Sequence, residues 1–128
     1  TLIHSDLRAD NLLFDREGNK VFIVDWQGTS TGPAGWDLAY FMSQSLSVET
    51  RRKNEAMLLD RYMESLKETG KNLDPAEALA GYADSMLYGL VVACSLPLIS
   101  DENEKRVKEL ASVMTRRSFE AMKDHNKF

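Results

Sequence analysis

Apolar residues near the start of the chain occur in two short runs. Leu12–Phe14 and Val21–Val24 are apolar at every position, and a polar connection containing Gly18 joins them. Such runs on either side of a Gly-containing turn predict a β-hairpin. Because no polar position alternates with the apolar ones, we expect the hairpin to be covered on both faces, partly by helices of this chain.

After residue 35, apolar positions recur with helical spacing, which predicts four helices. Their expected ranges are about 36–45, 48–69, 75–95 and 101–123. Residues 28–35 hold three Gly and one Pro and are expected to form a loop. The tail 123–128 is expected to fray.

Residues that favour helix ends mark the boundaries of these segments. Ser47, Asp74 and Ser100 are expected to act as N-caps, with Pro75 in the first turn after Asp74. Gly70 is expected to end the second helix, and Pro97 to interrupt or end the third.

The third helix is expected to be the central core helix, because apolar residues are most frequent in it. The positions expected to face the core are Leu38, Phe41, Met42 and Leu46; Met57, Leu58, Tyr62 and Leu66; Leu79, Tyr82, Ala83, Met86, Leu87, Leu90, Val91 and Cys94; and Val107, Leu110, Ala111, Met114 and Phe119.

The register of the hairpin determines which polar residues meet at its open end. Antiparallel pairing centred on the connection places Leu12 opposite Val24, and therefore Asn11 opposite Asp25. Facing residues on antiparallel strands lie roughly 4.5–5.5 Å apart at Cα. An amide and a carboxylate are thus expected to converge at one edge.

Further polar residues lie just upstream of that edge. Asp6 is one short loop away, with His4 and Arg8 beside it. Two carboxylates and one amide suit a hard divalent cation that keeps several waters and takes its remaining ligands from phosphate.

The segment His4–Asn11 has the pattern His-x-Asp-x-x-x-x-Asn, and an apolar run ending in Asp25 follows the hairpin. This arrangement resembles the catalytic and metal-binding segments of the protein-kinase-like phosphotransferases. It looks most like the group of aminoglycoside phosphotransferases, choline kinases and ecdysteroid-kinase-like proteins, and Pro33–Phe41 strengthens the match. The resemblance implies a mainly helical α+β fold. In it, residues 1–128 form the C-terminal lobe, with a catalytic loop and short β-hairpin followed by about four helices.

Two positions depart from the patterns of the resembling families. Ser5 stands where the small-molecule kinases usually carry Gly. Trp26-Gln27 replaces the Phe-Gly that follows the metal-binding Asp in protein kinases, which argues against a protein kinase proper.

The resemblance implies a role for each polar residue of the site. Asp6 would be the base, or orienting group, for an acceptor hydroxyl; otherwise it is a loop Asp that caps a turn. Asn11 and Asp25 would hold Mg²⁺ on the phosphates of ATP or another nucleoside triphosphate. Taken singly, each of the two also has an ordinary structural explanation as a turn residue or a strand end.

Three further residues support the site or line it. His4 is expected to pack and hydrogen-bond beneath the metal loop rather than react. Arg8 would stabilise charge on the transferred phosphoryl group, or else is a surface Arg paired with Asp10 or Asp37. Asp37 would accept hydrogen bonds from backbone amides of the catalytic loop, or else is an acid favoured by the dipole in a helix's first turn.

Composition narrows the possible partners. Hydrophobic residues make up 43% of the chain, charged residues make up 28%, and the net charge is −4 without a basic stripe. Nucleic acid is therefore an unexpected partner. The single Cys94 excludes an internal disulfide and suits a reducing, cytoplasmic location. No apolar run was expected to reach the length needed to span a membrane.

A kinase-like enzyme also needs a Gly-rich loop and a strand-borne Lys to hold its nucleotide. Neither occurs here, because Gly28–Gly32 follows the metal-binding Asp and contains no Lys. The sequence thus predicts that residues 1–128 are the C-terminal part of a longer protein, whose N-terminal lobe completes the active site.

The sequence is compatible with three functions. The leading hypothesis is an ATP-dependent, Mg²⁺-requiring kinase that phosphorylates a hydroxyl of a small molecule, with the fragment alone inactive. The alternative is a non-catalytic helical interaction module of kinase-like ancestry. A metal hydrolase using His and Asp is the weakest, because only His4 and His125 are available.

Overall fold

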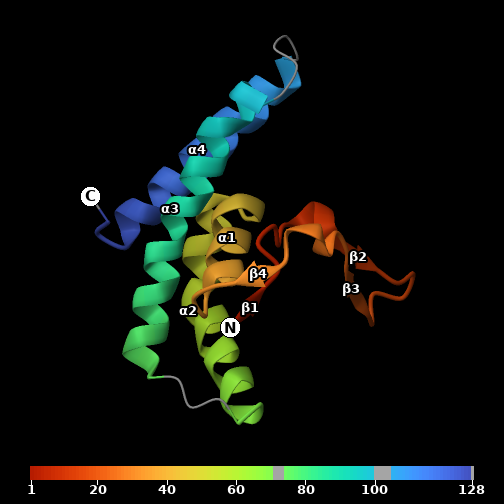
Figure 1. Cartoon of the computed structure of the whole chain (residues 1–128), viewed down its shortest axis with the longest axis vertical. Helices are drawn as coiled ribbons and strands as arrows, with labels where there is room; N and C mark the ends of the chain where they lie inside the picture. Colours follow the sequence, from red (N-terminus) through yellow and green to blue (C-terminus); the bar gives the residue numbers. More distant parts are fainter. Residues whose placement is uncertain (71–73, 100–104, 128) are drawn as a thin grey trace.

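The computed structural model describes residues 1–70, 74–99 and 105–127. Four helices form the body of the molecule, and a β-hairpin projects from it (Figure 1). The helices are α1 (Trp36–Ser45), α2 (Val48–Glu68), α3 (Pro75–Ile99) and α4 (Lys105–Asp124). This arrangement confirms the predicted mainly helical α+β fold.

The strands form two separate antiparallel pairs. In one, β1 (Leu2–Ile3) pairs with β4 (Ser30–Thr31); in the other, β2 (Leu12–Phe14) pairs with β3 (Val21–Ile23). The strand β4 corrects the expectation that residues 28–35 are loop throughout. Two residues are too few to show a strand period in the sequence.

The register of the hairpin differs by one residue from the prediction. Leu12 pairs with Ile23, so Asn11 lies opposite Val24 rather than Asp25. The turn sets this register. The amide of Asp15 bonds the carbonyl of Lys20 at 3.1 Å, which leaves four residues in the connection. Since successive side chains alternate between faces, a shift of one residue changes which side chains share a face.

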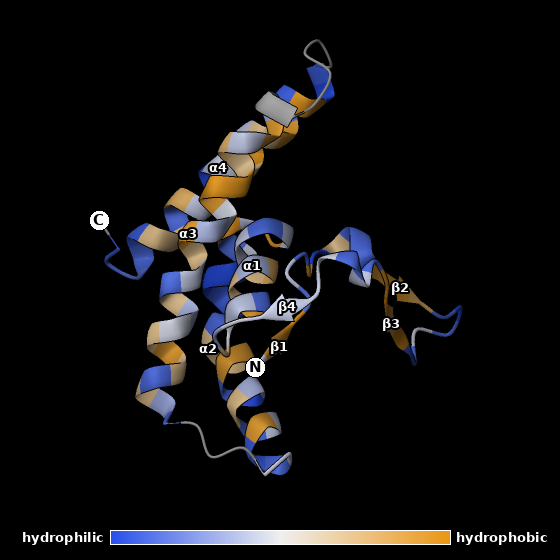
Figure 2. Cartoon of the chain, viewed as in Figure 1, coloured by the Kyte–Doolittle hydropathy of each residue, from blue (hydrophilic) through white to orange (hydrophobic). Residues whose placement is uncertain are grey.

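The apolar residues of the hairpin are exposed, contrary to the expectation that helices of this chain cover them. Leu13, Phe14, Val21 and Phe22 are each more than half exposed. Figure 2 shows these hydrophobic strands extending away from the helices. The helices of this chain do not reach them, because α1–α4 pack against one another.

Most helix boundaries agree with the local signals. The Ser47 side chain accepts the Thr50 amide at 3.1 Å, and Asp74 accepts the Ala76 amide at 3.1 Å. Gly70 has a φ of +74° directly after α2, as a helix-ending Gly should. The proposed cap Ser100 and the expected first residues 101–104 of the last helix lie outside the described residues.

Pro97 does not end α3, which continues to Ile99. A Pro lacks one backbone donor and clashes with the carbonyl four residues earlier. So close to the C-terminal end of the helix, this disturbance affects only the last turns.

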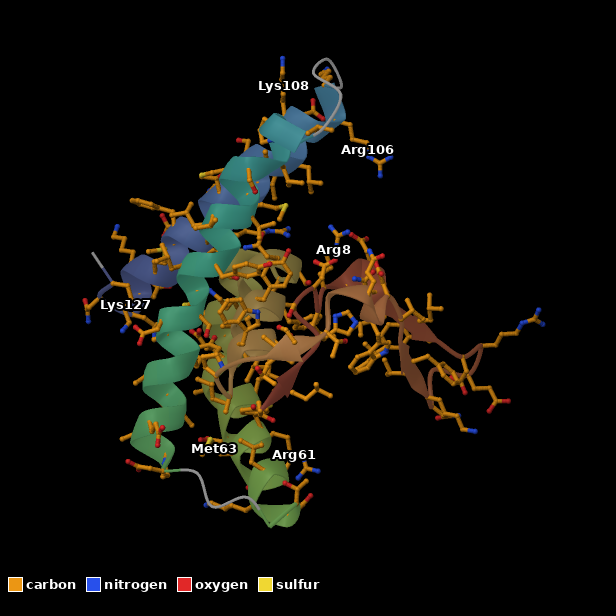
Figure 3. All side chains as sticks on the ribbon, in the orientation of Figure 1. Arg8, Arg61, Met63, Arg106, Lys108 and Lys127 are labelled. Carbon is orange, nitrogen blue, oxygen red and sulfur yellow. The ribbon has the colours of Figure 1, made fainter. Side chains whose placement is uncertain are left out.

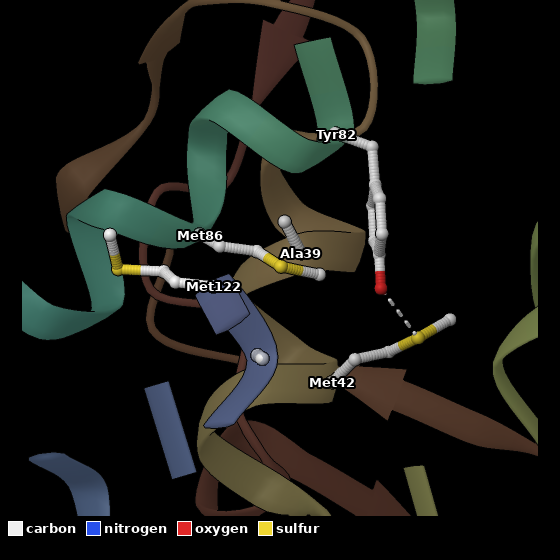
Figure 4. Close-up of a cluster of buried hydrophobic side chains, with 6 residues drawn as sticks. Ala39, Met42, Tyr82, Met86 and Met122 are labelled. Atoms are coloured by element: carbon white, nitrogen blue, oxygen red, sulfur yellow. Dashed lines mark hydrogen bonds between the residues drawn. The ribbon is translucent and has the colours of Figure 1, made fainter. Parts of the chain in front are cut away.

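The core lies where α1, α3 and α4 meet. It contains Ala39, Met42, Tyr82, Met86, Ala121 and Met122, and Figure 4 shows the Tyr82 hydroxyl facing the Met42 sulfur, 3.1 Å away. The central position predicted for α3 is confirmed by its packing on both α1 and α4.

Several positions predicted to face the core are exposed instead: Met57, Leu79, Leu87, Val91, Cys94, Leu110 and Phe119. Helical spacing locates an apolar stripe, but α3 is apolar over most of its circumference. Neighbouring helices cover only part of it.

The segment Pro75–Pro97 is long and apolar enough to cross a membrane by length and composition, and a third of its most apolar window is buried. The expectation that no apolar run reaches that length is therefore wrong. Within the fold, Tyr82 and Met86 of this segment are core residues, as in the central helix of a helical domain.

A buried charged cluster joins α2, α4 and the tail. Arg51 is only 1% exposed and forms ion pairs with Glu55, at 2.7 Å, and with Asp124. A buried guanidinium needs such partners, because an unpaired buried charge is strongly unfavourable.

The tail is anchored, contrary to the expectation that it frays. Nε2 of His125 lies 3.0 Å from Oε1 of Glu55, and its ring meets the Tyr82 ring edge-on. Nζ of Lys127 bonds Oδ1 of Asp84 at 2.6 Å. These contacts hold the chain against α2 and α3 as far as residue 127.

Candidate active site

The loop after β1 brings four of the predicted site residues together. Nδ2 of Asn11 donates to the backbone carbonyl of Asp6 at 2.8 Å and to its Oδ2 at 3.2 Å. Nε of Arg8 lies 3.5 Å from the same Oδ2, and Nδ1 of His4 accepts the Asp6 amide at 3.3 Å. Asp6 is thus the centre of this group.

Arg8 pairs within the loop. Besides Asp6, it approaches Asp10, with NH1 3.8 Å from Oδ2 of Asp10, whereas Asp37 is not among its ion-pair partners in the described part of the chain. Figure 3 shows Arg8 extending from the loop, between the helices and the hairpin. Its side chain is one-third exposed, so a guanidinium N–H can turn toward a bound ligand.

His4 lies beneath the loop and is 3% exposed. Its Nε2 lies 2.9 Å from the carbonyl of Val24, which can only accept, so Nε2 carries a proton. Its Nδ1 accepts the Asp6 amide and so is unprotonated. This network assigns one tautomer and ties the loop to the end of the hairpin.

Asp37, in the first turn of α1, binds the same loop through both carboxylate oxygens. Oδ2 accepts the His4 amide at 2.7 Å, and Oδ1 accepts the Ser5 amide at 3.0 Å. These are the backbone hydrogen bonds that the resemblance implies for this residue.

Asp25 is linked to this group of residues by a backbone hydrogen bond of its neighbour Val24. The Val24 amide donates to the Asn11 carbonyl at 3.0 Å, so Asp25 follows directly after the last hydrogen bond between the strands. Asp25 has a φ of +66°, an uncommon conformation for a residue with a Cβ. The chain thus turns at Asp25, directly after the last hydrogen bond of the ladder.

Two oxygen groups at this edge are available to a ligand. The hydrogen bonds of the Asn11 side chain use its nitrogen, and within residues 1–70, 74–99 and 105–127 its Oδ1 and the Asp25 carboxylate form no hydrogen bond or ion pair. The described residues contain no group of three or more His, Cys, Asp or Glu that could hold a metal alone. One carboxylate and one amide oxygen nonetheless fit Mg²⁺, which takes its other ligands from water and phosphates.

Ser5, one of the two positions at which the chain departs from the patterns of the resembling families, has a φ of +72°. Gly adopts this conformation without the steric cost that a Cβ imposes. The backbone here thus has the shape that a Gly would favour, and Ser5 adopts it while its hydroxyl lies 3.0 Å from that of Ser30.

Sequence reasoning missed two features of α1 beside the loop, one hydrogen bond and one buried hydroxyl. The Ser45 hydroxyl accepts the Ala9 amide at 2.9 Å. Tyr40 is 2% exposed, and burial together with the adjacent Asp6 carboxylate raises the pKa of its hydroxyl well above the ordinary value. The available signal for Ser45 was its eight-residue spacing from Asp37, which places the two about 80° apart around a helix.

The chain is similar in sequence to kinase-like proteins. Residues 1–74 match the ecdysteroid kinase-like family. The chain is 36% identical over 67 residues to an uncharacterized kinase-like protein of Caenorhabditis elegans, covering 52% of the chain and 18% of that protein. It is 32% identical over 93 residues to a 4-hydroxytryptamine kinase of Psilocybe cubensis, covering 65% of the chain and 25% of that enzyme.

The chain therefore spans about a fifth to a quarter of these curated relatives. No solved structure matches it. The family match covers more than half of the chain and includes every residue of the group around Asp6, together with Asp25 and Asp37. The chain belongs to the ecdysteroid kinase-like family.

Proposed function

We propose that the protein containing this chain is an ATP-dependent kinase that phosphorylates a hydroxyl of a small molecule. The observation that carries the proposal is the Asp6 carboxylate, held by Asn11 at 3.2 Å and Arg8 at 3.5 Å, while the Asn11 carbonyl accepts the amide of Val24, directly before Asp25. Phosphoryl transfer to a hydroxyl requires such an acid together with groups that can hold a cation.

Each residue then has a distinct task. Asp6 orients the acceptor hydroxyl and accepts its proton, because its carboxylate is partly exposed and held by its neighbours. Oδ1 of Asn11 and the carboxylate of Asp25 are the groups that would hold Mg²⁺. When bound, this ion neutralises charge on the phosphates of ATP or another nucleoside triphosphate.

Arg8 adds positive charge at the same place. Its Nε is buried and forms no hydrogen bond within the described residues, although it lies 3.5 Å from Asp6. The Arg8 side chain is one-third exposed, and an exposed N–H of the same guanidinium can donate to an equatorial phosphoryl oxygen. His4 and Asp37 hold the backbone of the loop and do not touch the reacting groups in this scheme.

A small-molecule acceptor is favoured by the relatives. The name of the 4-hydroxytryptamine kinase describes a small hydroxyl compound, and the family is named after steroid kinases. We propose an alcohol or phenol as acceptor. We also propose that the exposed hairpin packs against a nucleotide-binding lobe of the same protein. We further propose that the protein is cytoplasmic and binds neither nucleic acid nor membranes.

The exposed hairpin also favours the alternative, a non-catalytic interaction module. Leu13, Phe14, Val21 and Phe22 would then bind another protein, and the group around Asp6 would have no task in turnover. The two functions are separated by variants of the polar site, because these leave the hairpin unchanged.

The test uses the full-length protein with Mg²⁺, ATP and a panel of ecdysteroids, hydroxytryptamines, choline-like amines, sugars and aminoglycosides. Asp6→Asn is expected to lower kcat by about 10²–10⁴-fold with little change in nucleotide affinity. Asp25→Asn is expected to weaken Mg²⁺–nucleotide binding, measured by calorimetry. Glu17→Gln serves as the control, because the Glu17 side chain is exposed and contacts Asn19 within the turn of the hairpin. Turnover that is unchanged in Asp6→Asn contradicts the proposal.

A further inference from the structure

A cavity of about 560 Å³ lies between the beginning of α2 and the middle of α4. Both helices line it, and the polar residues of its wall are Ser47, Glu49, Arg52, Arg116 and Arg117. This volume falls within the range of pockets that bind small molecules. None of these residues belongs to the group around Asp6, so the cavity is a second candidate site.

Three guanidinium groups, from two different helices, are the main charges of the cavity. Arg52 comes from α2, whereas Arg116 and Arg117 come from α4. Arg116 is exposed, and it forms no hydrogen bond or ion pair with the described ranges 1–70, 74–99 and 105–127. Its N–H groups are therefore available to an oxyanion in the cavity.

The other two guanidinium groups are oriented by the protein itself. NH1 of Arg117 donates to the carbonyl of Gln44 at 2.7 Å. Nε of Arg52 donates to Asp124 at 2.7 Å, and NH2 of Arg52 donates to Glu120 at 2.6 Å. Because these contacts already hold the two side chains, a ligand that binds them costs little additional side-chain entropy.

The beginning of α2 adds backbone donors to the same wall. The Ser47 hydroxyl accepts the amide of Thr50 at 3.1 Å and so caps the helix. The amides of Val48 and Glu49, the first two of the helix, have no acceptor within it. Their partial positive charge adds to the potential created by the guanidinium groups.

The charge balance of the cavity favours an anion. Helix α4 contains six Lys or Arg and three Asp or Glu, although the whole chain has a net charge of −4. Asp124 and Glu120 balance the charge of Arg52. Arg116 and Arg117 then face a single carboxylate of the wall, that of Glu49, so a positive charge remains to attract an anion.

We infer that this cavity binds the phosphate group of a small phosphorylated molecule. A tetrahedral phosphate presents several acceptor oxygens and can accept from guanidinium groups on both helices and from the first amides of α2. A carboxylate has two oxygens and one negative charge, so it engages fewer of these donors. The inference does not depend on the proposed kinase activity.

Calorimetric titration of the full-length protein tests the inference, with inorganic phosphate and glycerol phosphate as probes. The ionic strength is held constant, and Mg²⁺ is removed by dialysis so that the site around Asp6 holds no cation. We expect Arg116→Gln to weaken the binding of both probes about tenfold, because it removes charge-assisted hydrogen bonds. The fold should be unchanged, since Arg116 contacts no polar group of the described ranges.

Arg106→Gln is the matched control. It removes the same charge from the same helix, but Arg106 is not part of the cavity wall and extends from the beginning of α4 (Figure 3). Its affinity for phosphate should stay within twofold of that of wild type. Glu49→Gln should act in the opposite direction and strengthen binding about threefold, because it removes the opposing charge.

Three outcomes would overturn the inference. One is a phosphate affinity of Arg116→Gln within twofold of that of wild type. Another is loss of phosphate binding in Arg8→Gln but not in Arg116→Gln, which would place the anion at the site around Asp6. The third is acetate binding as tightly as phosphate, or glycerol phosphate failing to bind, because the ligand would then not be a phosphorylated molecule.

Discussion

The carboxylate of Asp37 accepts the backbone amide of His4 at 2.7 Å, across 33 positions of sequence. Its second oxygen accepts the next amide, that of Ser5, at 3.0 Å. The first turn of α1 thereby satisfies two donors that β1 leaves unpaired as the chain turns into the loop. A helix end and a catalytic-type loop are joined by one side chain.

Removal of this carboxylate should loosen the loop. Asp37→Ala leaves two partly buried amides without an acceptor, each costing about 1–3 kcal/mol. We expect faster hydrogen exchange over residues 3–9 in the full-length protein. Asp37→Asn, which keeps one oxygen acceptor, should give an intermediate rate. Equal exchange in wild type and Asp37→Ala would show that the loop is held by other contacts.

Substitution of Ser5 should reveal the strain at its positive φ. Ser5→Gly relieves the Cβ clash of this conformation but loses the hydroxyl contact with Ser30. Ser5→Ala loses the contact and retains the clash. We therefore expect Ser5→Gly to be more stable than Ser5→Ala by about 1 kcal/mol in chemical denaturation. If the alanine variant is the more stable of the two, the backbone does not adopt this conformation in solution.

Gly89, in the middle of α3, should resist replacement by Ala. A Cβ at this position would collide with Nε2 of Gln44 and lie 3.1 Å from Oγ of Ser118, two atoms that hydrogen-bond each other at 2.6 Å. Helix propensity alone would favour Ala by about 1 kcal/mol. The overpacking penalty, about 1–3 kcal/mol, should reverse this sign.

The matched measurement uses the exposed Ala80 in the same helix. Ala80→Gly should cost about 1 kcal/mol and calibrates the propensity of α3. Gly89→Ala should lower the unfolding midpoint. A higher midpoint would mean that Gln44 moves aside without loss of its bond to Ser118.

Acid should weaken the attachment of α4 to α2. Hydrogen bonds from Arg52 and, against the effect of burial, from Arg51 lower the pKa of Asp124 to about 2. Burial by itself would raise the pKa of Glu55, but hydrogen bonds from His125 and Tyr82 and the charge of Arg51 bring it below its ordinary value. Folding thus favours both ionised forms. The contribution of these two carboxylates to the free energy of unfolding is complete above about pH 5 and is lost as the pH falls toward 2.

Denaturation between pH 7 and pH 3 measures this contribution. We expect Asp124 to contribute about 1 kcal/mol, less than its full pKa shift would give, because its carboxylate is partly solvated. Asp124→Asn should be less stable than wild type at pH 7, and the difference should shrink as the pH falls. A constant difference would assign the stability to packing instead.

Local signals predicted most of the secondary structure. Ser47, Gly70 and Asp74 act at helix ends as expected, because capping depends on a few adjacent residues. The predicted register of the hairpin was wrong by one residue. It depends on the conformation of the turn at Asp15–Lys20, which several turn types could have satisfied.

Which apolar positions would remain exposed was harder to predict. Leu87 and Val91 lie in an apolar helix and are more than half exposed, and the hairpin strands are apolar and uncovered by this chain. A hydrophobic pattern shows which residues favour burial. It does not show which surface is available to bury them.

The sequence by itself determined the chemical set, since His4, Asp6, Arg8, Asn11, Asp25 and Asp37 follow one another at spacings that local structure can bring to one edge. Only the tertiary structure decided how that set is held: α1 lies along the loop, and its residues Asp37 and Ser45 accept the amides of His4, Ser5 and Ala9. The physical reason is that spacing along a chain fixes distances within an element. The pairing of a loop with a helix 30 or more residues away depends on packing between elements, which no local pattern records.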